Sequence, residues 1–217
     1  MEVAMRMLML ALLWLLSSTG WAEQPAARVN GVEIGVMRLE RYFSEYLDAQ
    51  GRAVTSIRNP GLYKRLRDQA LDELIDKELL WQEAQRRGIV ISDEEVSAQV
   101  SQLEAAFGSP AVFERKLAEA GFDRANYADY VRHELAAQQV YAQLSVVDEP
   151  GKPEVEAFYR ANRQRLQGTQ NQSDNPSVIP EQGLELARAA LIEQLQAQAR
   201  QAVRQRLRDS ATVEVAD

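Results

Sequence analysis

Asp72–Val96, DELIDKELLWQEAQRRGIVISDEEV, is the stretch that decides the predicted fold. Its first part has the apolar spacing of an amphipathic helix. That helix is expected to stop at Arg86–Gly88, because glycine readily adopts the left-handed conformation that ends helices. A new helix begins after Ser92, whose spacing to Glu95 is that of a capping box. The stretch is therefore a joint between two helices, and it contains no catalytic motif.

Apolar residues on both sides of this joint also recur at helical intervals, so most of the chain from Val36 to Leu166 is predicted to be helical. Gly51 and Gly121 end two of these helices, and Asp123 is the expected N-cap of another. The residues that mark these helices are Tyr42, Phe43, Tyr46 and Leu47; Val96, Val100, Leu103 and Phe107; Phe113 and Leu117; Tyr127, Tyr130, Val131, Leu135 and Tyr141; and Val155, Phe158 and Tyr159. Of these, Phe107, Phe113 and Leu117 are assigned to the core.

Both ends of the chain carry short strand signals. Val29–Ile34 is β-branched around Asn30-Gly31, a dipeptide typical of tight hairpins. Val213–Val215 alternates like a strand and follows an amphipathic helix over Gly183–Asp209, which needs a partner surface. We expect this helix to fold back and Val213–Val215 to pair beside Val29–Ile34. The predicted fold class is therefore mainly α, with a small β element made from both ends of the chain.

Four segments are expected along the chain. Residues 1–22 combine a positive charge, an unbroken apolar run and a small-x-small pattern, which predicts an export signal cleaved after about Ala22. Residues 23–166 form the first part of the helical domain, and residues 183–217 complete it. Residues 167–182 are polar and proline-punctuated, which predicts a flexible linker. A homodimer with exchanged terminal helices is an alternative that this linker would allow.

The composition argues against several classes of function. The formal net charge is −7 and the acidic residues outnumber the basic ones, which argues against nucleic acid as a partner. The absence of cysteine excludes disulfides, thiolate nucleophiles and cysteine-ligated metals. Neither of the glycine-rich phosphate-binding motifs occurs, so the protein is expected to work without ATP. No cofactor and no metal are predicted.

The remaining polar candidates have structural interpretations. His133 is the single histidine, and it is interpreted as a surface or boundary residue of its helix rather than as a catalytic base. Asp93–Glu95 cluster at a helix N-terminus, where negative charge offsets the helix dipole, so they are not assigned to a metal site. The arginine run of the last helix complements the dipole at its C-terminus and is interpreted as a solvated face: Arg200, Arg204, Arg206 and Arg208.

The order of these features is similar to that of one protein family. An export signal, VNGVEI at 29–34, ALDELIDKELLWQEAQRRGIVISDEEV at 70–96, the series from Phe107 to Leu135, and ATVEV at 211–215 together resemble the chaperone region of the SurA-like and PrsA-like extracytoplasmic folding factors. The resemblance implies a helical domain like the N-terminal domain of SurA.

The departure from that family is also informative. Its members usually carry a parvulin-type prolyl isomerase domain, and the linker at 167–182 stands in its place here. Parvulin sites are built around paired histidines, whereas this chain has one histidine. The resemblance therefore implies the chaperone region without the isomerase, and no catalytic residue is expected.

The function that the resemblance implies is a periplasmic chaperone, which binds unfolded or partly folded exported and outer-membrane proteins without ATP. Tyrosine offers a large contact area with few rotatable bonds, which suits contact with extended chains. The predicted client-binding residues are Tyr42, Tyr46, Tyr127, Tyr130 and Tyr141, although an aromatic stripe at helical spacing is also typical of a core. Two alternative functions are a dedicated assembly subunit of a secretion or polysaccharide-export system and a prolyl cis–trans isomerase with an unrecognised site.

Overall fold

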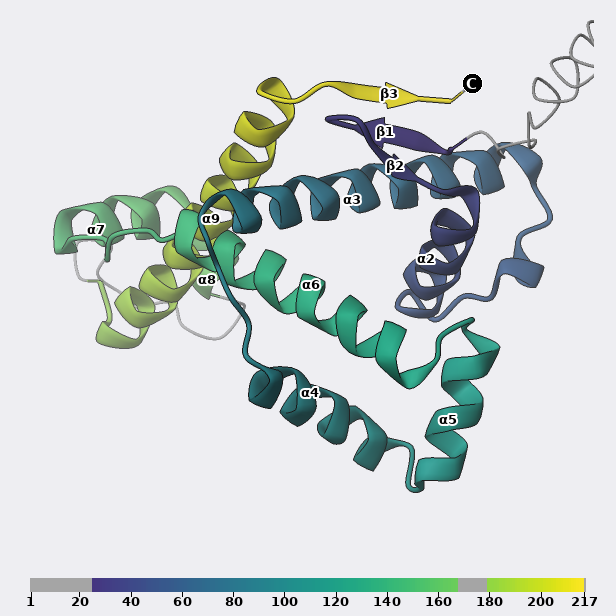
Figure 1. The fold of residues 1–217 in the computed structure, drawn as a ribbon. Coiled ribbons are helices and arrows are strands. Elements are labelled where there is room, and N and C mark those ends of the chain that lie inside the picture. The colour runs from purple at the N-terminus through teal and green to yellow at the C-terminus, as the bar shows by residue number, and fades with distance from the viewer. Residues whose placement is uncertain (1–24, 168–178, 217) are drawn as a thin grey trace, which may run out of the picture. The chain divides into compact units, whose positions relative to one another are not determined.

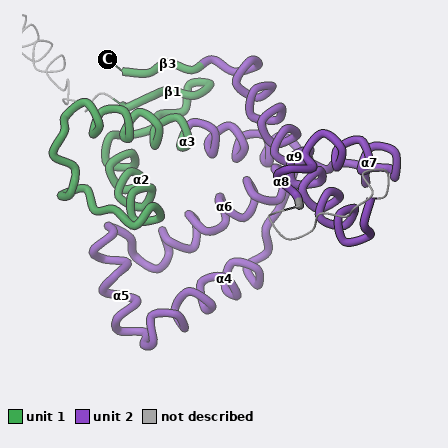
Figure 2. Tube along the Cα trace, turned by 180° about the vertical axis from the view of Figure 1, so that it is seen from behind, with its two compact units in different colours: residues 1–74, 213–217 green, residues 75–212 purple. Residues whose placement is uncertain are grey.

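The computed structural model describes residues 25–167 and 179–216, which fall into two compact units. Unit 1 comprises residues 25–74 and 213–216, and unit 2 comprises the described residues from 75 to 212 (Figure 2). The predicted fold class is confirmed, because the described chain is mainly helical with one three-stranded antiparallel sheet. The predicted export signal and most of the predicted linker lie outside the described residues. No helix within the described ranges has the length and apolar character that crossing a membrane requires.

The sheet of unit 1 joins the two ends of the described chain. β1 (Ala27–Val29) pairs antiparallel with β2 (Val32–Ile34) on one side and with β3 (Val213–Val215) on the other, as Figure 1 shows. The turn between β1 and β2 has positive φ at both Asn30 (52°) and Gly31 (84°), the combination that a type I′ hairpin requires. The predicted hairpin and the predicted pairing of the C-terminal strand are therefore confirmed.

The helical part of unit 1 consists of α2 (Val36–Asp48), the short 3-10 turn η1 (Val54–Ser56) and the first part of α3 (Pro60–Arg86). The Phe43 side chain of α2 is fully buried. Its ring meets that of Tyr63 on α3 edge-on, with the ring centroids 5.2 Å apart. Because aromatic pairs in this geometry add to the free energy gained by burial, this contact stabilises α2 against α3.

Two helices of unit 2 begin at the residues that the sequence predicts, α4 (Asp93–Ala106) and α6 (Arg124–Leu144), and α5 (Pro110–Glu119) lies between them in the chain. Before α4, the Glu95 N–H donates to Ser92 Oγ (3.2 Å) and the Ser92 N–H donates to Glu95 Oε2 (2.9 Å). These two bonds are the predicted capping box, which satisfies backbone donors that the helix leaves free. The predicted cap Asp123 is present before α6, and Ser109 caps α5 in the same way.

The prediction that Phe107 belongs to the core is wrong, because this residue is 38% exposed. Phe107 is the C-cap of α4, where the apolar stripe of that helix ends, and its ring lies 5.9 Å from that of Phe113 between centroids. Phe113 and Leu117 are buried, as predicted. Burial at a helix end depends on what packs beyond it, and helical periodicity carries no information about that.

The last helices of unit 2 share a small core of their own. At the ends of the predicted linker, Gln167 closes α8 (Arg163–Gln167) and Glu181 opens α9 (Glu181–Asp209). The buried residues of this core come from α7 (Lys152–Ala161) and α9, and they are Val155, Tyr159, Ala187 and Leu191.

Two arginines of the run in α9, Arg204 and Arg208, do not belong to the solvated face that the sequence analysis predicts, whereas Arg206 is exposed. Arg208 Nε donates to Asp76 Oδ1 at 2.5 Å, and Arg204 Nε lies 3.7 Å from Asp76 Oδ2. Asp76 belongs to α3, and its side chain is 17% exposed. The prediction is wrong for these two arginines because their partner lies 132 residues before Arg208 in the sequence, so that local spacing gives no sign of it.

Glu83, near the end of α3, is a carboxylate held by two arginines. It is 8% exposed and accepts hydrogen bonds from Arg86 Nε (2.8 Å) and Nη2 (2.7 Å) and from Arg87 Nε (2.6 Å). The hydrogen bonds from Arg86 have the largest effect on the pKa of Glu83, and the bond from Arg87 acts in the same direction. Together they outweigh the effect of burial and lower this pKa from 4.5 to about 2. Because the folded pKa lies below the unfolded one, ionised Glu83 stabilises the fold above about pH 4.5, and this contribution is lost as the pH falls toward 2.

We expect Glu83→Gln to lower the free energy of unfolding by about 1 kcal/mol at pH 7, and by progressively less as the pH falls from 4.5 toward 2. The effect is kept small because the Arg86 side chain is 69% exposed, and solvent screens its charge. Urea denaturation of wild type and variant across this pH range measures the difference. A difference that stays constant down to the lowest pH would contradict the assignment.

Candidate functional site

Unit 2 contains a pocket of about 530 Å³, which we call the α6 pocket. A volume in this range is typical of ligand-binding pockets. Most of the lining comes from one face of α6, because its lining residues recur at intervals of three and four. The lining consists of Lys77 and Leu80 from α3, Gln99 from α4, and Tyr127, Tyr130, Val131, Glu134, Leu135, Ala137, Gln138 and Tyr141 from α6. In Figure 1, α6 runs between α4 and the part of α3 that belongs to unit 2.

Besides the tyrosine hydroxyls, the polar groups of the α6 pocket are an ion pair and two amides. Lys77 Nζ lies 2.5 Å from Glu134 Oε2, with the two side chains 30% and 36% exposed. The charges of this pair offset one another, so the lining carries no net charge from it. Gln99 and Gln138 each supply a carbonyl acceptor and an amide donor to the same lining. These groups can form hydrogen bonds with a peptide backbone without demanding a particular sequence.

Two tyrosines of the lining belong to an aromatic cluster. The rings of Tyr127 and Tyr130 have centroids 5.9 Å apart, and Phe122 contacts both, at 5.5 Å and 5.3 Å. The buried ring of Phe113 lies edge-on to Tyr127, with centroids 5.9 Å apart. Both tyrosines are half-buried, so each has one part fixed by its neighbours and one part in the lining. The cluster therefore presents an aromatic surface to the pocket.

Tyr141 is held by the last helix. Its hydroxyl donates to the backbone carbonyl of Arg200 at 3.2 Å and accepts a hydrogen bond from Arg204 Nη1. Arg204 is also the residue that lies beside Asp76. The position of Tyr141 in the lining therefore depends on how α9 packs in unit 2.

The structure brings together three of the five predicted client-binding residues, Tyr127, Tyr130 and Tyr141, in the lining of one pocket. The other two, Tyr42 and Tyr46, belong to unit 1 and line no part of it. Their hydroxyls donate to α3, Tyr42 to Glu73 Oε2 at 2.8 Å and Tyr46 to Gln69 Oε1 at 3.2 Å.

Sequence reasoning missed the polar residues of the pocket. Glu134 and Gln138 could have been found, because they follow Tyr127 and Tyr130 at helical spacing and so share their face. Lys77 and Gln99 come from other helices, and nothing in the sequence relates them to that face.

His133 lies on the same helix but outside the lining of the pocket. Its ring stacks on Trp81 of α3, with centroids 3.9 Å apart and planes at 20°, and the residue as a whole is exposed. Over residues 25–167 and 179–216, no cluster of three or more histidine and carboxylate side chains is placed to hold a metal ion. The chemistry that the α6 pocket offers is non-covalent binding through aromatic, aliphatic and amide groups.

Comparison with known proteins gives a family and a related structure. The profile of the SurA-like N-terminal domain family matches residues 2–141, well over half of the chain. A solved structure from Campylobacter jejuni, one of two structurally related SurA-like chaperones (the virulence factor PEB4 and the periplasmic protein Cj1289), is similar with a TM-score of 0.53 at 13% sequence identity. That similarity covers 88% of this chain and 98% of the other. No curated protein matches this chain.

Proposed function

This chain belongs to the SurA-like N-terminal domain family, and from that premise we propose that it is a periplasmic chaperone that binds unfolded or partly folded exported proteins, including outer-membrane proteins, without ATP. Binding rather than catalysis is the activity, and no cofactor takes part. The α6 pocket is the client-binding site. Related structures described as SurA-like chaperones, one of them called periplasmic, support the general role and the location.

The observation that carries the proposal is the composition of the α6 pocket. Two half-buried tyrosines, fixed by the aromatic cluster, supply contact area whose conformational entropy is already low. Gln99 and Gln138 can bond to the backbone of any extended chain. A pocket with this lining can accept many sequences, and its weak polar contacts keep binding reversible, which a chaperone without ATP requires.

The test is suppression of the aggregation of a chemically unfolded protein, followed by light scattering, with residues 23–217. We expect Tyr127→Leu/Tyr130→Leu to reduce the suppression several-fold, because the double change keeps apolar volume but removes the rings and hydroxyls that clients contact. The matched control is Tyr42→Leu/Tyr46→Leu, the same chemical change at two tyrosines outside the pocket. Circular dichroism establishes that each variant is folded.

Equal activity of wild type and of the Tyr127/Tyr130 variant would contradict the assignment of the α6 pocket. A failure of the wild-type protein to suppress aggregation would contradict the function itself. Addition of ATP is expected to change neither result.

A further inference from the structure

The sheet of unit 1 has a free edge along β3. The strand order is β2-β1-β3, so β3 has β1 on one side, and no other described strand pairs with its second side. The Ala216 N–H donates to the Ala26 carbonyl at 3.1 Å, and Glu214 lies opposite Arg28 in the register. In an antiparallel pair, alternate residues turn their backbone groups toward the partner. Residues 214 and 216 therefore face β1, whereas the N–H and C=O groups of residues 213 and 215 point away from it.

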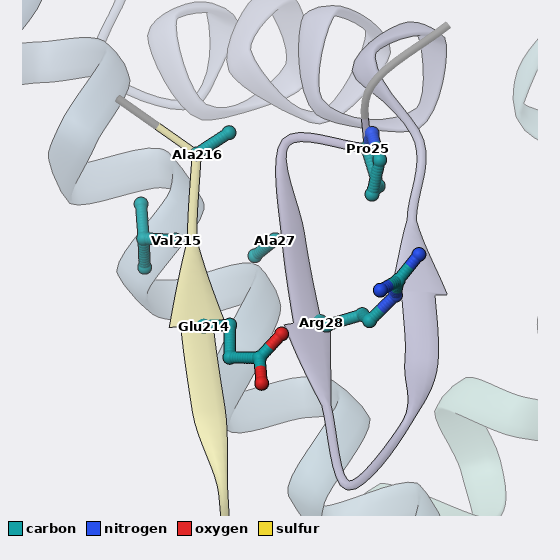
Figure 3. Close-up of a pocket in the computed structure, with 6 residues that line it drawn as sticks. All are labelled: Pro25, Ala27, Arg28, Glu214, Val215 and Ala216. Carbon is teal, nitrogen blue, oxygen red and sulfur yellow. The ribbon is translucent and has the colours of Figure 1, made fainter. Parts of the chain in front are cut away.

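The polar face of this sheet carries an unbalanced row of charges. Arg28 on β1 lies opposite Glu33 on β2 and Glu214 on β3. Its guanidinium binds Glu33, with Nη2 2.5 Å from Oε1, and Figure 3 shows the Arg28 side chain extending away from β3. The pKa of Arg28 is raised, first by the hydrogen bond to Glu33 and to a smaller extent by the charge of Glu214. Among the described residues Glu214 has no ion-pair partner within 4.0 Å, so the charge of Arg28, which is bound to Glu33, compensates this carboxylate only in part.

The opposite face ends in an exposed apolar residue. Ile34, Ala27 and Val215 lie side by side across the three strands. Ile34 and Ala27 are buried, at 0% and 1% exposure, whereas Val215 is 56% exposed because it lies at the edge. A hollow of about 280 Å³ is lined by residues of both β1 and β3 and their flanks, which Figure 3 shows: Pro25, Ala27, Arg28, Glu214, Val215 and Ala216. One more strand beside β3 would cover Val215 and lie opposite Glu214.

We propose that the free edge of β3 accepts an extended segment of a client as an antiparallel fourth strand, with lysine or arginine opposite Glu214 and a β-branched apolar residue beside Val215. Main-chain hydrogen bonds to residues 213 and 215 supply the affinity, and the charge at Glu214 selects segments of the pattern apolar–basic–apolar. This inference rests on the proposed chaperone function and adds a second, more selective contact to it.

Two alternatives to a client strand at β3 are less favourable: a second copy of this chain at the same edge, and a client strand at the outer edge of β2. A second copy of β3, paired antiparallel about its centre, would place two Glu214 carboxylates opposite one another, and like charges in that position are destabilising. The outer edge of β2 offers less backbone. Residues 32 and 34 of β2 face β1 in the two-residue hairpin, so Glu33 is the only residue within β2 that faces outward, and the carbonyl of the next residue that would do so, Gly35, already accepts the Leu39 N–H of α2.

The probes are two capped peptides, Ser-Thr-Val-Lys-Val-Thr-Ser and Ser-Thr-Val-Glu-Val-Thr-Ser, labelled for fluorescence anisotropy and titrated with residues 23–217 of the protein. We expect the lysine peptide to bind about three- to tenfold more tightly, because a cross-strand pair of opposite charges replaces one of like charges. Glu214→Lys is expected to reverse this preference. Asp48→Lys makes the same change of charge at an exposed position of α2, outside the sheet, and it is expected to leave the preference unchanged.

A second variant tests the backbone contact. Val215→Pro removes an N–H that points away from β1, so the pairing of β3 with β1 keeps its hydrogen bonds while the incoming strand loses a donor. We expect at least tenfold weaker binding of both peptides. Hydrogen exchange of the Val213 and Val215 amides in the wild-type protein is expected to slow when the lysine peptide is added.

Several results would overturn the inference: no binding of either peptide, a preference that survives Glu214→Lys, or normal binding by Val215→Pro. A wild-type dimer that becomes a monomer in Val215→Pro, measured by light scattering, would assign the edge to a second copy instead. These failures are distinct from failure of the proposed function, because suppression of aggregation through the α6 pocket would persist in the β3 variants.

Discussion

Replacing Asp76 by asparagine is expected to lower the free energy of unfolding of unit 2 by about 2–3 kcal/mol. The side chain is 17% exposed and lies beside two arginines of α9, Arg208 at 2.5 Å and Arg204 at 3.7 Å. Asparagine keeps the shape but removes the charge, so the two guanidinium groups lose their shared partner. Hydrogen exchange should show the loss in the second half of α9, around residues 200–209, more than in its first half, which packs on α7.

The control for Asp76→Asn is Glu193→Gln, which removes one negative charge from an exposed position of α9. We expect it to change stability by less than about 0.5 kcal/mol. Equal effects of the two variants would show that the loss of stability comes from the change in net charge and not from the ion pairs of Asp76. Tyr141 adds a functional readout. Because its hydroxyl bonds to Arg204, loosening α9 should also weaken client binding at the α6 pocket.

The second large effect is expected at Gly183, where alanine should be destabilising by about 1–3 kcal/mol. Gly183 lies in the first turn of α9, and a Cβ there would stand 2.7 Å from Tyr159 Cε2 and 3.2 Å from its Cζ. Tyr159 is 2% exposed, so its ring has no room to move aside. The expected change in stability is opposite to the usual one, because alanine in place of glycine inside a helix normally stabilises a protein by about 1 kcal/mol.

A double-mutant cycle separates the steric contact with Tyr159 from the effect of the higher helix propensity of alanine. Tyr159→Leu removes the ring atoms that a Cβ at position 183 would meet. In that background Gly183→Ala is expected to become stabilising by up to about 1 kcal/mol. Thermal or urea unfolding of the four proteins gives the two values. A destabilisation that persists in the Tyr159→Leu background would mean that backbone strain, and not the ring, causes it.

The elements of this fold could be predicted because their signals are local. The capping box of Ser92 and Glu95 joins residues three positions apart, and the Asn30-Gly31 turn joins adjacent strands. Helical periodicity placed three of the predicted tyrosines on one face of α6, where they now line one pocket. The same periodicity wrongly predicted that Phe107 belongs to the core. Phe107 lies at the end of α4, and the spacing of apolar residues along a helix does not show what packs beyond its end.

The polar partners could not be predicted in the same way. Tyr42 and Tyr46 are of a residue type that suits a binding surface, yet their hydroxyls donate hydrogen bonds to Glu73 and Gln69 of α3. Nothing about a tyrosine side chain distinguishes a phenol that binds a neighbouring helix from one that lines a pocket. The lysine at position 77 likewise had no feature in the sequence relating it to the tyrosine face of α6.

The sequence by itself determined where the helices and strands lie, because apolar spacing, caps and turn residues act over a few positions. It also indicated that the two ends of the chain form one sheet, because the last amphipathic helix needs a partner surface and a strand signal follows it. Tertiary structure alone decided which charged and aromatic groups meet: Asp76 with the arginines of α9, Lys77 with Glu134, and Arg28 with Glu33 and Glu214 across the sheet. The physical reason is that these contacts join residues brought together by the packing of apolar faces, and many polar side chains would satisfy the same local pattern.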